Sequence, residues 1–219
     1  MPLFREIRDT VTDFLFPKSK RVLELEALPT AELLKTLPIT GNPERANTWA
    51  IFDYENTLVK ELIWELKYSG NKIIAEKLGE ILFDFIKNKL NEEKIFEAFP
   101  RPLVLPVPIP GKRLFERGWN QAELLVNEMK KCDAEHLFKY LPGQLVKTRH
   151  TESQTKTSSR TEREKNLKNS MRILNPASVA GSCIVVVDDV VTTGSTFAEA
   201  ERALKEAGAK KVISIAIAH

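Results

Sequence analysis

The stretch from Cys183 to Thr196, CIVVVDDVVTTGST, constrains the fold more than any other part of this 219-residue chain. It begins with four β-branched residues, Ile184 to Val187, the pattern of a strand buried on both faces. Two adjacent aspartates and a small, hydroxyl-rich turn follow, after which apolar residues at helical spacing predict a helix that ends at Gly208. A second apolar run, Val212 to Ala218, completes a strand–helix–strand unit, and such a unit demands a parallel sheet.

The turn after this predicted strand has the properties of a phosphate-binding loop. Ligands of open parallel sheets bind beyond the carboxyl ends of the strands, where backbone N–H groups and a helix N-terminus attract an anion. Gly194 lets the backbone approach that anion closely, and the neighbouring hydroxyls can donate further hydrogen bonds. The two carboxylates would repel a phosphate, but they suit vicinal sugar hydroxyls or the water shell of Mg²⁺. The pattern therefore predicts a site for a sugar phosphate.

These residues resemble the phosphoribosyl-pyrophosphate (PRPP) motif of type I phosphoribosyltransferases. The resemblance implies an α/β fold with a central parallel sheet flanked by helices, and PRPP with Mg²⁺ as the ligand. It assigns Asp188 and Asp189, as the catalytic pair, to the ribose 2′- and 3′-hydroxyls, and it assigns to the 5′-phosphate the loop residues Thr192, Thr193, Gly194, Ser195 and Thr196. The Mg²⁺ would be held through PRPP, with no direct protein ligand assigned.

This stretch has one structural alternative to the PRPP motif. An ordinary strand–turn–helix with an acidic N-cap is the alternative that stays open. A P-loop is excluded because no Gly-Lys-Ser/Thr follows the turn, and a dinucleotide-binding fold is excluded because GxGxxG is absent.

Composition places the chain among globular proteins that function in the cytoplasm. Hydrophobic residues make up 42% and charged residues 29%, which is ordinary for a soluble domain. No apolar run approaches the ~20 residues that span a bilayer, so we expect no membrane contact. The first residues show no signal-cleavage pattern, and two cysteines, Cys132 and Cys183, cannot form a disulfide framework. The net charge of +3 does not by itself indicate nucleic-acid binding.

The chain divides into an N-terminal appendage, residues 1–50, and a phosphoribosyltransferase-like domain, residues 51–219. The appendage combines a helical apolar face, an acidic Leu-rich segment and a connector rich in Gly, Pro and Asn, and we find no catalytic candidate in it. Residues 51–90 are predicted to be mostly helical, with a break at Gly70 and Asn71. Just before the break, Lys67 is either a cation at a helix C-terminus or a functional residue.

A second candidate loop follows the run from Pro102 to Val107, which we predict to be the first strand of the sheet. Pro-rich sequence and then Gly111, Lys112 and Arg113 predict a stiff loop that offers free N–H groups and two cations. A pyrophosphate needs such a loop, since arginine presents a planar fork to phosphate oxygens. A rigid loop with solvated cations is the alternative.

Short strands are predicted at residues 144–147 and 171–174, and the segment between them is basic. From Lys147 to Arg172 the chain carries eight Lys or Arg against three Glu, a net charge of +5. Its Ser and Thr content predicts a mobile loop, and its lack of aromatic residues argues against a stacking platform for single strands. In phosphoribosyltransferases a loop at this place closes over the reacting sugar, and the resemblance makes Arg149 and Arg163 the candidate lid cations.

Several segments together resemble the ComF family, phosphoribosyltransferase-like proteins linked to bacterial DNA uptake. The matching segments are Phe52 to Asn71, Leu105 to Leu125, Arg149 to Asn166 and the PRPP motif. ComF proteins commonly carry a four-cysteine zinc module after a Leu-Phe-Pro segment. Here Leu15-Phe16-Pro17 is followed by no cysteine, so we expect no zinc.

The sequence thus predicts a PRPP-binding phosphoribosyltransferase that releases pyrophosphate when a nitrogen acceptor attacks the sugar, in DNA uptake or in nucleotide metabolism. The competing hypothesis is a non-catalytic DNA-handling adaptor that binds PRPP or a nucleotide as a signal. The partners implied by the resemblance are single-stranded DNA, helicases of DNA uptake or replication restart, and a second copy in a homodimer. No residue identifies the acceptor.

Overall fold

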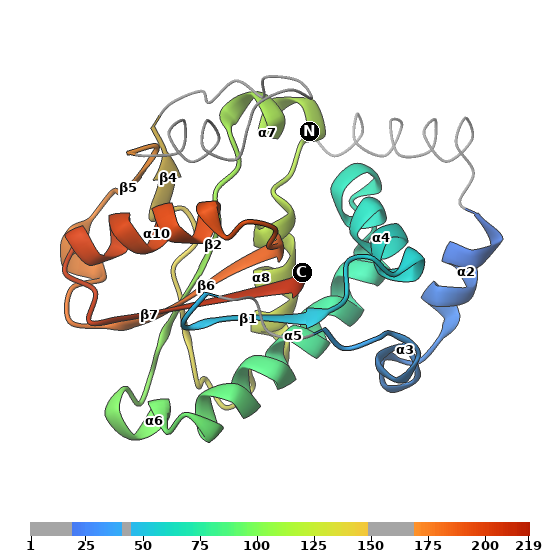
Figure 1. The fold of residues 1–219 in the computed structure, drawn as a ribbon, viewed down its shortest axis with the longest axis horizontal. Helices are drawn as coiled ribbons and strands as arrows, with labels where there is room; N and C mark the ends of the chain where they lie inside the picture. The colour runs from blue at the N-terminus through green and yellow to red at the C-terminus, as the bar shows by residue number, and fades with distance from the viewer. Residues whose placement is uncertain (1–18, 41–44, 149–168) are drawn as a thin grey trace.

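The computed structural model describes residues 19–40, 45–148 and 169–219 (Figure 1). Five parallel strands form its central sheet in the order β1-β7-β6-β2-β3. Their bounds are β1 (Thr48–Phe52), β2 (Leu103–Pro106), β3 (Lys139–Tyr140), β6 (Cys183–Val190) and β7 (Lys211–Ala218). Strand β6 is the middle strand. It pairs with both β2 and β7 as far as Val187, and from Asp188 onward it pairs with β7 alone. The predicted α/β fold with a parallel sheet flanked by helices is confirmed.

Helices cover both faces of this sheet (Figure 1). Val185 and Val187 of β6 belong to the core on one face, and Ile184 and Val186 belong to the core on the other. The first face is covered by α5 (Lys72–Glu92) and α8 (Gln121–Cys132), and the second by α10 (Ser195–Glu206). Successive strand residues point to opposite faces, so a strand covered on both faces needs an uninterrupted apolar run, which explains the sequence of β6.

A second, two-stranded antiparallel sheet lies beside α10 (Figure 1). It consists of β4 (Leu145–Lys147) and β5 (Met171–Ile173), at the two positions where short strands were predicted. Residues 149–168, most of the basic segment, lie between these strands and outside the described residues. The shorter elements are the helices α4 (Thr57–Trp64), α6 (Ile95–Ala98) and α7 (Gly111–Arg117), the π-helix η1 (Glu65–Ser69) and the 3₁₀-helix η2 (Pro176–Ser178).

The N-terminal part of the described chain packs onto the domain. Helices α2 (Lys20–Ala27) and α3 (Thr30–Thr36) place Leu25 and Leu33 in the core on the α5 face. Strand β1 follows at the edge of the sheet, so the boundary that we drew between residues 50 and 51 falls inside a strand.

Three local predictions are corrected by these elements. The first strand along the chain is β1, and the run from Pro102 to Val107 contains the second, β2. The sequence did not predict β1 because this short strand adjoins the Gly/Pro/Asn-rich connector, whose composition indicates a loop. Strand β6 continues through both aspartates to Val190. Residues 111–113 begin helix α7 instead of forming a loop, and Pro110 before them has the extended backbone of an N-cap residue (φ −58°, ψ 143°).

None of the helices in the described ranges combines the length and the apolar character that crossing a membrane requires.

Candidate functional site

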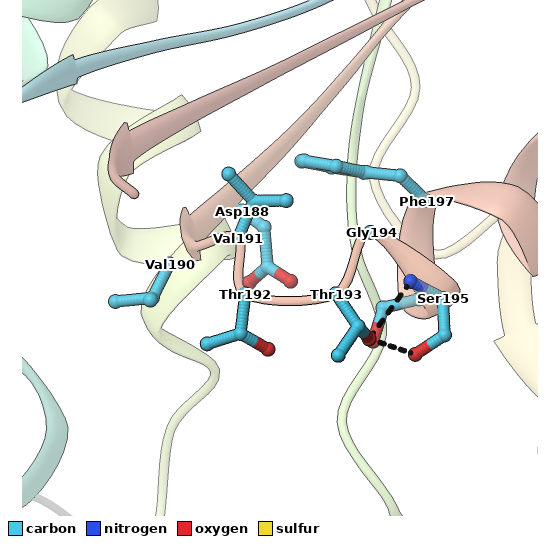
Figure 2. Close-up of a pocket in the computed structure, with 9 residues that line it drawn as sticks. Asp188, Val190, Val191, Thr192, Thr193, Gly194, Ser195 and Phe197 are labelled. Atoms are coloured by element: carbon cyan, nitrogen blue, oxygen red, sulfur yellow. Dashed lines mark hydrogen bonds between the residues drawn. The ribbon is translucent and has the colours of Figure 1, made fainter. Parts of the chain in front are cut away.

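The loop between β6 and α10 forms a small cavity that opens at the carboxyl edge of the sheet (Figure 2). Its walls consist of Asp188, Val190, Val191 and the run Thr192 to Phe197. Gly194 has a left-handed conformation, φ = 72°, and caps the N-terminus of α10, a position that glycine occupies without strain. The five residues predicted for a phosphate thus lie together around one cavity.

The polar groups of this loop point to an anion as its ligand. Thr193 Oγ1 lies 2.9 Å from Ser195 Oγ and accepts a hydrogen bond of 3.4 Å from the Ser195 N–H (Figure 2). Within the described residues, the backbone N–H groups of Thr193, Gly194 and Thr196 have no hydrogen-bond acceptor. Unpaired N–H groups at a helix N-terminus attract negative charge, so the loop can bind a phosphate.

The two aspartates at the end of β6 address opposite faces of the sheet, because neighbouring residues of a strand alternate. Asp188 lies on the α10 face and lines the cavity of the loop. Its pKa is raised well above the usual range, first because burial disfavours the charged form and then because Asp189 adds negative charge. One oxygen of Asp188 accepts the Asp189 N–H at 2.9 Å, which fixes the carboxyl group.

A lysine that the sequence had not singled out stands near Asp188. Lys147 ends strand β4, and its pKa is lowered, mainly by burial and further by the charge of Arg113, while Asp188 acts in the opposite direction. Lys147 therefore lies close enough to Asp188 and to Arg113 for both charges to act on it. The cationic side chains near the site therefore come from β4 as well as from α7.

Asp189 lies on the other face, where a second lysine contacts it. Lys67 Nζ is 3.0 Å from Asp189 Oδ2, and Asp189 is only 7% exposed. Lys67 belongs to the π-helix η1, a type of helix that often occurs at functional sites. The sequence left Lys67 open between a helix end and a functional residue, and the structure places it at the acidic pair.

The position of η1 is fixed by a set of contacts from the start of α8, which we call the clamp: Trp119, Asn120 and Gln121. Trp119 Nε1 donates to Leu66 O at 2.9 Å, and Gln121 Nε2 donates to Lys67 O at 3.3 Å. Asn120 Nδ2 donates to Val107 O at 2.9 Å, just after β2. The clamp thus holds both the helix that carries Lys67 and the end of the strand that leads to α7.

Close packing at Gly70 completes the attachment of η1. Gly70 ends η1 with φ = 58°, and a Cβ atom there would lie 3.0 Å from the Trp119 ring. The segments Phe52 to Asn71 and Leu105 to Leu125, which carry part of the resemblance to the ComF family, are therefore in direct contact with each other.

The predicted pyrophosphate cations lie on α7, whose residues are all exposed or half-buried. Lys112 and Arg113 have no carboxylate partner within the described residues, so their charge is available to an anion. The lid candidates Arg149 and Arg163 lie outside the described residues, and their assignment stays a prediction.

Arg45, from the segment in which we expected no candidate, also reaches the loop. Its side chain ends in an ion pair with Glu201 of α10, and its Cδ would be 3.4 Å from a Cβ atom at Gly194. No motif marks this arginine, because only the folded chain brings residue 45 next to residue 194.

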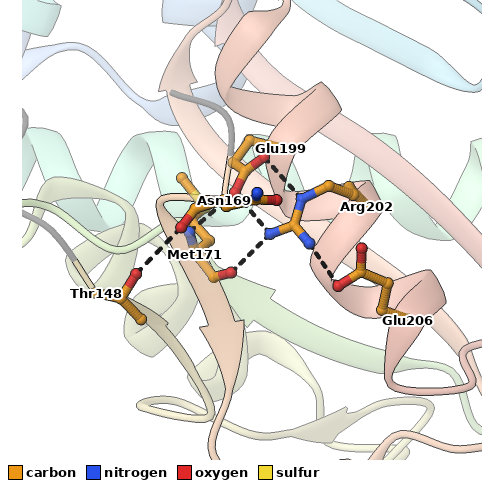
Figure 3. A network of polar contacts seen from close by, with 6 residues as sticks. All are labelled: Thr148, Asn169, Met171, Glu199, Arg202 and Glu206. Carbon is orange, nitrogen blue, oxygen red and sulfur yellow. Dashed lines mark hydrogen bonds and ion pairs between the residues drawn. The ribbon is translucent and has the colours of Figure 1, made fainter. Parts of the chain in front are cut away.

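An ion pair between a buried glutamate and a half-buried arginine connects α10 to the small sheet (Figure 3). Glu199 accepts the Met171 N–H at 3.0 Å and pairs with Arg202 at 2.7 Å, and Arg202 also donates to Met171 O at 2.9 Å. The helix that begins at the phosphate loop is thereby joined to β5, next to the described end of the basic segment.

Within the described ranges, no three His, Cys, Asp or Glu side chains are grouped so as to hold a metal ion.

A parallel α/β sheet with an acidic central strand, followed by an N–H-rich, hydroxylated loop, defines the phosphoribosyltransferase class. Consistently, the family described as Phosphoribosyl transferase domain matches residues 134–219. The "DNA utilization protein YhgH" of Escherichia coli (strain K12) is 34% identical over 167 residues, covering 74% of this chain and 67% of that protein. "Competence protein F" of Haemophilus influenzae is 29% identical, covering 69% of this chain and 63% of that protein. The chain belongs to this ComF-type family of phosphoribosyltransferase-like proteins.

Among solved structures, the chain is similar to a glutamine PRPP amidotransferase from B. subtilis, complexed with ADP and GMP. That similarity has a TM-score of 0.39 at 20% sequence identity and covers 70% of this chain and 30% of that one.

Proposed function

We propose that this protein binds PRPP with Mg²⁺ and transfers its phosphoribosyl group to a nitrogen acceptor. The proposal is based on one observation: N–H groups, carboxylates and cationic side chains lie near the same edge of the sheet. The loop from Thr192 to Thr196 offers unpaired N–H groups, the end of β6 offers two carboxylates, and η1, β4 and α7 offer cations. These groups match the 5′-phosphate, the ribose hydroxyls and the pyrophosphate of a single ligand.

In the reaction, a nitrogen lone pair attacks the anomeric carbon, and the bond from that carbon to pyrophosphate breaks with its electron pair. The nitrogen then loses a proton, so the products are the N-riboside phosphate and pyrophosphate. The chain contributes mainly by positioning the sugar and by placing Lys112, Arg113 and Lys147 where negative charge develops on the leaving group. Mg²⁺ bound together with PRPP would supply further charge neutralisation there, and the two aspartates would meet its water shell.

The names of the relatives favour one second candidate, a DNA-handling adaptor in which PRPP or a nucleotide is a signal. Those names, DNA utilization protein and Competence protein, describe a process and not a reaction. In this alternative the ligand binds without turnover, and single-stranded DNA or a helicase is the partner. Both proposals assume a protein of the cytoplasm, and a homodimer is compatible with either.

Calorimetry with PRPP and Mg²⁺ tests the shared part of both proposals. We expect the double variant Asp188→Asn with Asp189→Asn to lose roughly 3 kcal/mol or more of binding free energy, since each charged hydrogen bond contributes about 1.5–3 kcal/mol. The matched control is Glu92→Gln with Glu93→Gln, another adjacent pair of acids, which pairs with Lys89 at the end of α5. Equal PRPP affinity in the acidic-pair variant and the control would defeat the assignment.

A pyrophosphate-release assay with a panel of nitrogen bases separates the two proposals. Release with any base supports the transferase. PRPP binding without release from any base, together with salt-sensitive binding of single-stranded DNA, supports the adaptor.

A further inference from the structure

The side chain of Arg45 connects the phosphate loop to the body of helix α10. Its Cδ lies 3.4 Å from the position that a Cβ atom would take at Gly194, and Gly194 lines the cavity of the loop. Its Nη2 forms an ion pair with Glu201 in the second turn of the helix. The stem of Arg45 thus lies beside the cavity, while its charged end is turned toward Glu201.

The face of α10 between these two contacts carries little side-chain bulk. Gly194, Ala198 and Glu201 follow one another at spacings of four and three residues, which places them on one face of the helix. Gly194 has no side chain and Ala198 has only a methyl group, so nothing large on this face separates the loop from Glu201. The guanidinium can therefore move between Glu201 and the loop without displacing a side chain of α10.

The ion pair with Glu201 leaves most of the binding capacity of Arg45 unused. The side chains of Arg45 and Glu201 are 36% and 32% exposed, and pairs with such exposure stabilise a protein little, because solvent screens their charges. An arginine offers five N–H donors, but among the described residues only Nη2 of Arg45 has an acceptor. Arg45 can therefore exchange Glu201 for a stronger anion at a small cost in free energy.

We propose that Arg45 is a further phosphate-binding residue of the loop, and that Glu201 competes with the phosphate for its guanidinium. This inference rests on the proposed PRPP binding and adds a residue that selects ligands by their 5′-phosphate. A phosphate monoester carries a charge of about −1.5 to −2 at neutral pH, more than a carboxylate, and its oxygens accept the planar fork of an arginine. The guanidinium follows directly on Cδ, so rotation about the last bonds of the side chain brings it to the anion.

The test is calorimetry of the full chain with ribose 5-phosphate, which carries the phosphate but no pyrophosphate. We expect Arg45→Ala to weaken its binding about tenfold, since a hydrogen bond to a charged group contributes a factor of that order. Arg45→Lys keeps the charge and should recover part of this loss. Glu201→Gln removes the competing charge and should strengthen binding by up to about fivefold, the factor that an exposed ion pair contributes. The two partners of one ion pair should thus change the affinity in opposite directions, whereas a merely structural pair would change it in the same direction.

The matched control is Arg21→Ala, which removes another half-exposed arginine from a pair with a glutamate, Glu61 at 3.3 Å, and should leave binding unchanged. The inference is overturned when Arg45→Ala and Arg21→Ala bind ribose 5-phosphate equally, or when Arg45→Ala and Glu201→Gln both weaken its binding. An equal loss of pyrophosphate affinity in Arg45→Ala also overturns it, because Arg45 would then act as a general positive charge.

The same variants are measured with PRPP and Mg²⁺, and the same factors are expected because PRPP carries the same phosphate. If the unaltered chain binds PRPP but not ribose 5-phosphate, the comparison of Arg45→Ala with Glu201→Gln is decided on PRPP. Failure of the proposed function looks different, because the unaltered chain would then not bind PRPP, whatever the effect of Arg45→Ala on ribose 5-phosphate. A chain that binds neither ligand overturns both proposals.

Discussion

The two faces of strand β6 carry the two halves of the candidate site in different ways. On the α10 face, one contiguous stretch supplies Asp188 and the whole phosphate loop, within ten residues of sequence. On the α5 face, Asp189 meets a lysine from η1 that is held by the clamp of α8. The first half is therefore local in sequence, and the second is assembled from three distant segments.

The comparison extends to the electrostatics of the two aspartates. Asp188 is half-buried beside a loop that offers N–H groups, and its pKa is raised. Asp189 has an ammonium group at 3.0 Å. Two identical neighbouring residues thus have different surroundings because a strand turns them to opposite faces. We infer that the α10 face is shaped for the ligand, whereas the α5 face supplies support and charge.

The largest effect should come from removing the support on the α5 face. Trp119→Ala removes a buried indole and leaves Leu66 O without its donor. We expect the free energy of unfolding to fall by about 3–5 kcal/mol, as for other large aromatic deletions in a core. Urea denaturation measures it, and Trp119→Phe, which keeps most of the apolar contact, should cost clearly less. A loss below 1 kcal/mol in Trp119→Ala would mean that the clamp does not hold η1.

The α10 face has its own structural connection, and breaking it should cost somewhat less. Arg202→Ala leaves the buried Glu199 carboxylate without its cation, so we expect a loss of about 3 kcal/mol in the free energy of unfolding. Glu206→Ala removes only the exposed partner of the same arginine, and its expected cost stays below about 1 kcal/mol. Equal losses in the free energy of unfolding for Arg202→Ala and Glu206→Ala would show that the pair with Glu199 stabilises the fold no more than an exposed pair does.

The same pair predicts a dependence on pH. Burial alone would raise the pKa of Glu199, but hydrogen bonds from Arg202 and from the Met171 N–H outweigh burial, and the pKa is lowered. The stabilisation is therefore fully present above the ordinary Glu value of about 4.3 and is lost as the pH falls through the lowered folded-state pKa. Unfolding experiments across this acidic range should show a smaller loss with falling pH in Arg202→Ala than in the unaltered chain.

A smaller effect should come from Gly70, and it measures how tightly the clamp packs. Gly70→Ala places a Cβ atom 3.0 Å from the Trp119 ring at φ = 58°. Gly143→Ala is the matched control, because Gly143 also has positive φ, 76°, with open space around it. The left-handed backbone costs each variant about 1–2 kcal/mol, so any additional loss in Gly70→Ala reports the contact with the indole. Identical losses would indicate that the Trp119 ring moves aside freely.

The contrast between the faces also explains which parts of the site could be predicted from sequence. The central strand, the phosphate loop and the small strands at residues 145–147 and 171–173 follow from short patterns of burial and turn chemistry. The sequence did not predict that Asp188 and Asp189 point to opposite faces of the sheet, because the strand was expected to end before them. Polar residues are usual after a strand, whereas here β6 continues through both aspartates, where it pairs with β7 alone.

The cations were harder to predict because their neighbours are distant in sequence. Trp119 lies 53 residues from Leu66, whose carbonyl it binds, and nothing in either local pattern announces that contact. Lys147 was counted only as the beginning of a basic segment, although folding leaves it half-buried and within reach of the charge of Asp188. Arg45 reaches α10 across 156 residues. Tertiary contacts of this kind need the folded chain.

Substituting Asp188 and Asp189 one at a time should change the stability least, but it tests the comparison most sharply. The expected change in the free energy of unfolding has opposite signs for the two aspartates. The raised pKa of Asp188 means that the folded state loses stability as the pH rises from the ordinary Asp value of about 3.9 to the folded-state pKa. Asp188→Asn removes this penalty and keeps an oxygen that can accept the Asp189 N–H. It should therefore stabilise the chain at pH 7, and do so less at pH 4.

Asp189→Asn should act in the opposite direction, because it removes the ion pair with the half-buried Lys67. Both variants should bind PRPP more weakly, so stability and affinity change together in Asp189→Asn and in opposite directions in Asp188→Asn. Urea denaturation at the two pH values, with calorimetry on the same samples, measures both quantities. If both substitutions shift stability with the same sign, the two faces of β6 do not differ as we infer. A binding cavity that costs stability is recognised by one result: removing a charged group from it makes the protein without ligand more stable. We expect that result for Asp188 and not for Asp189.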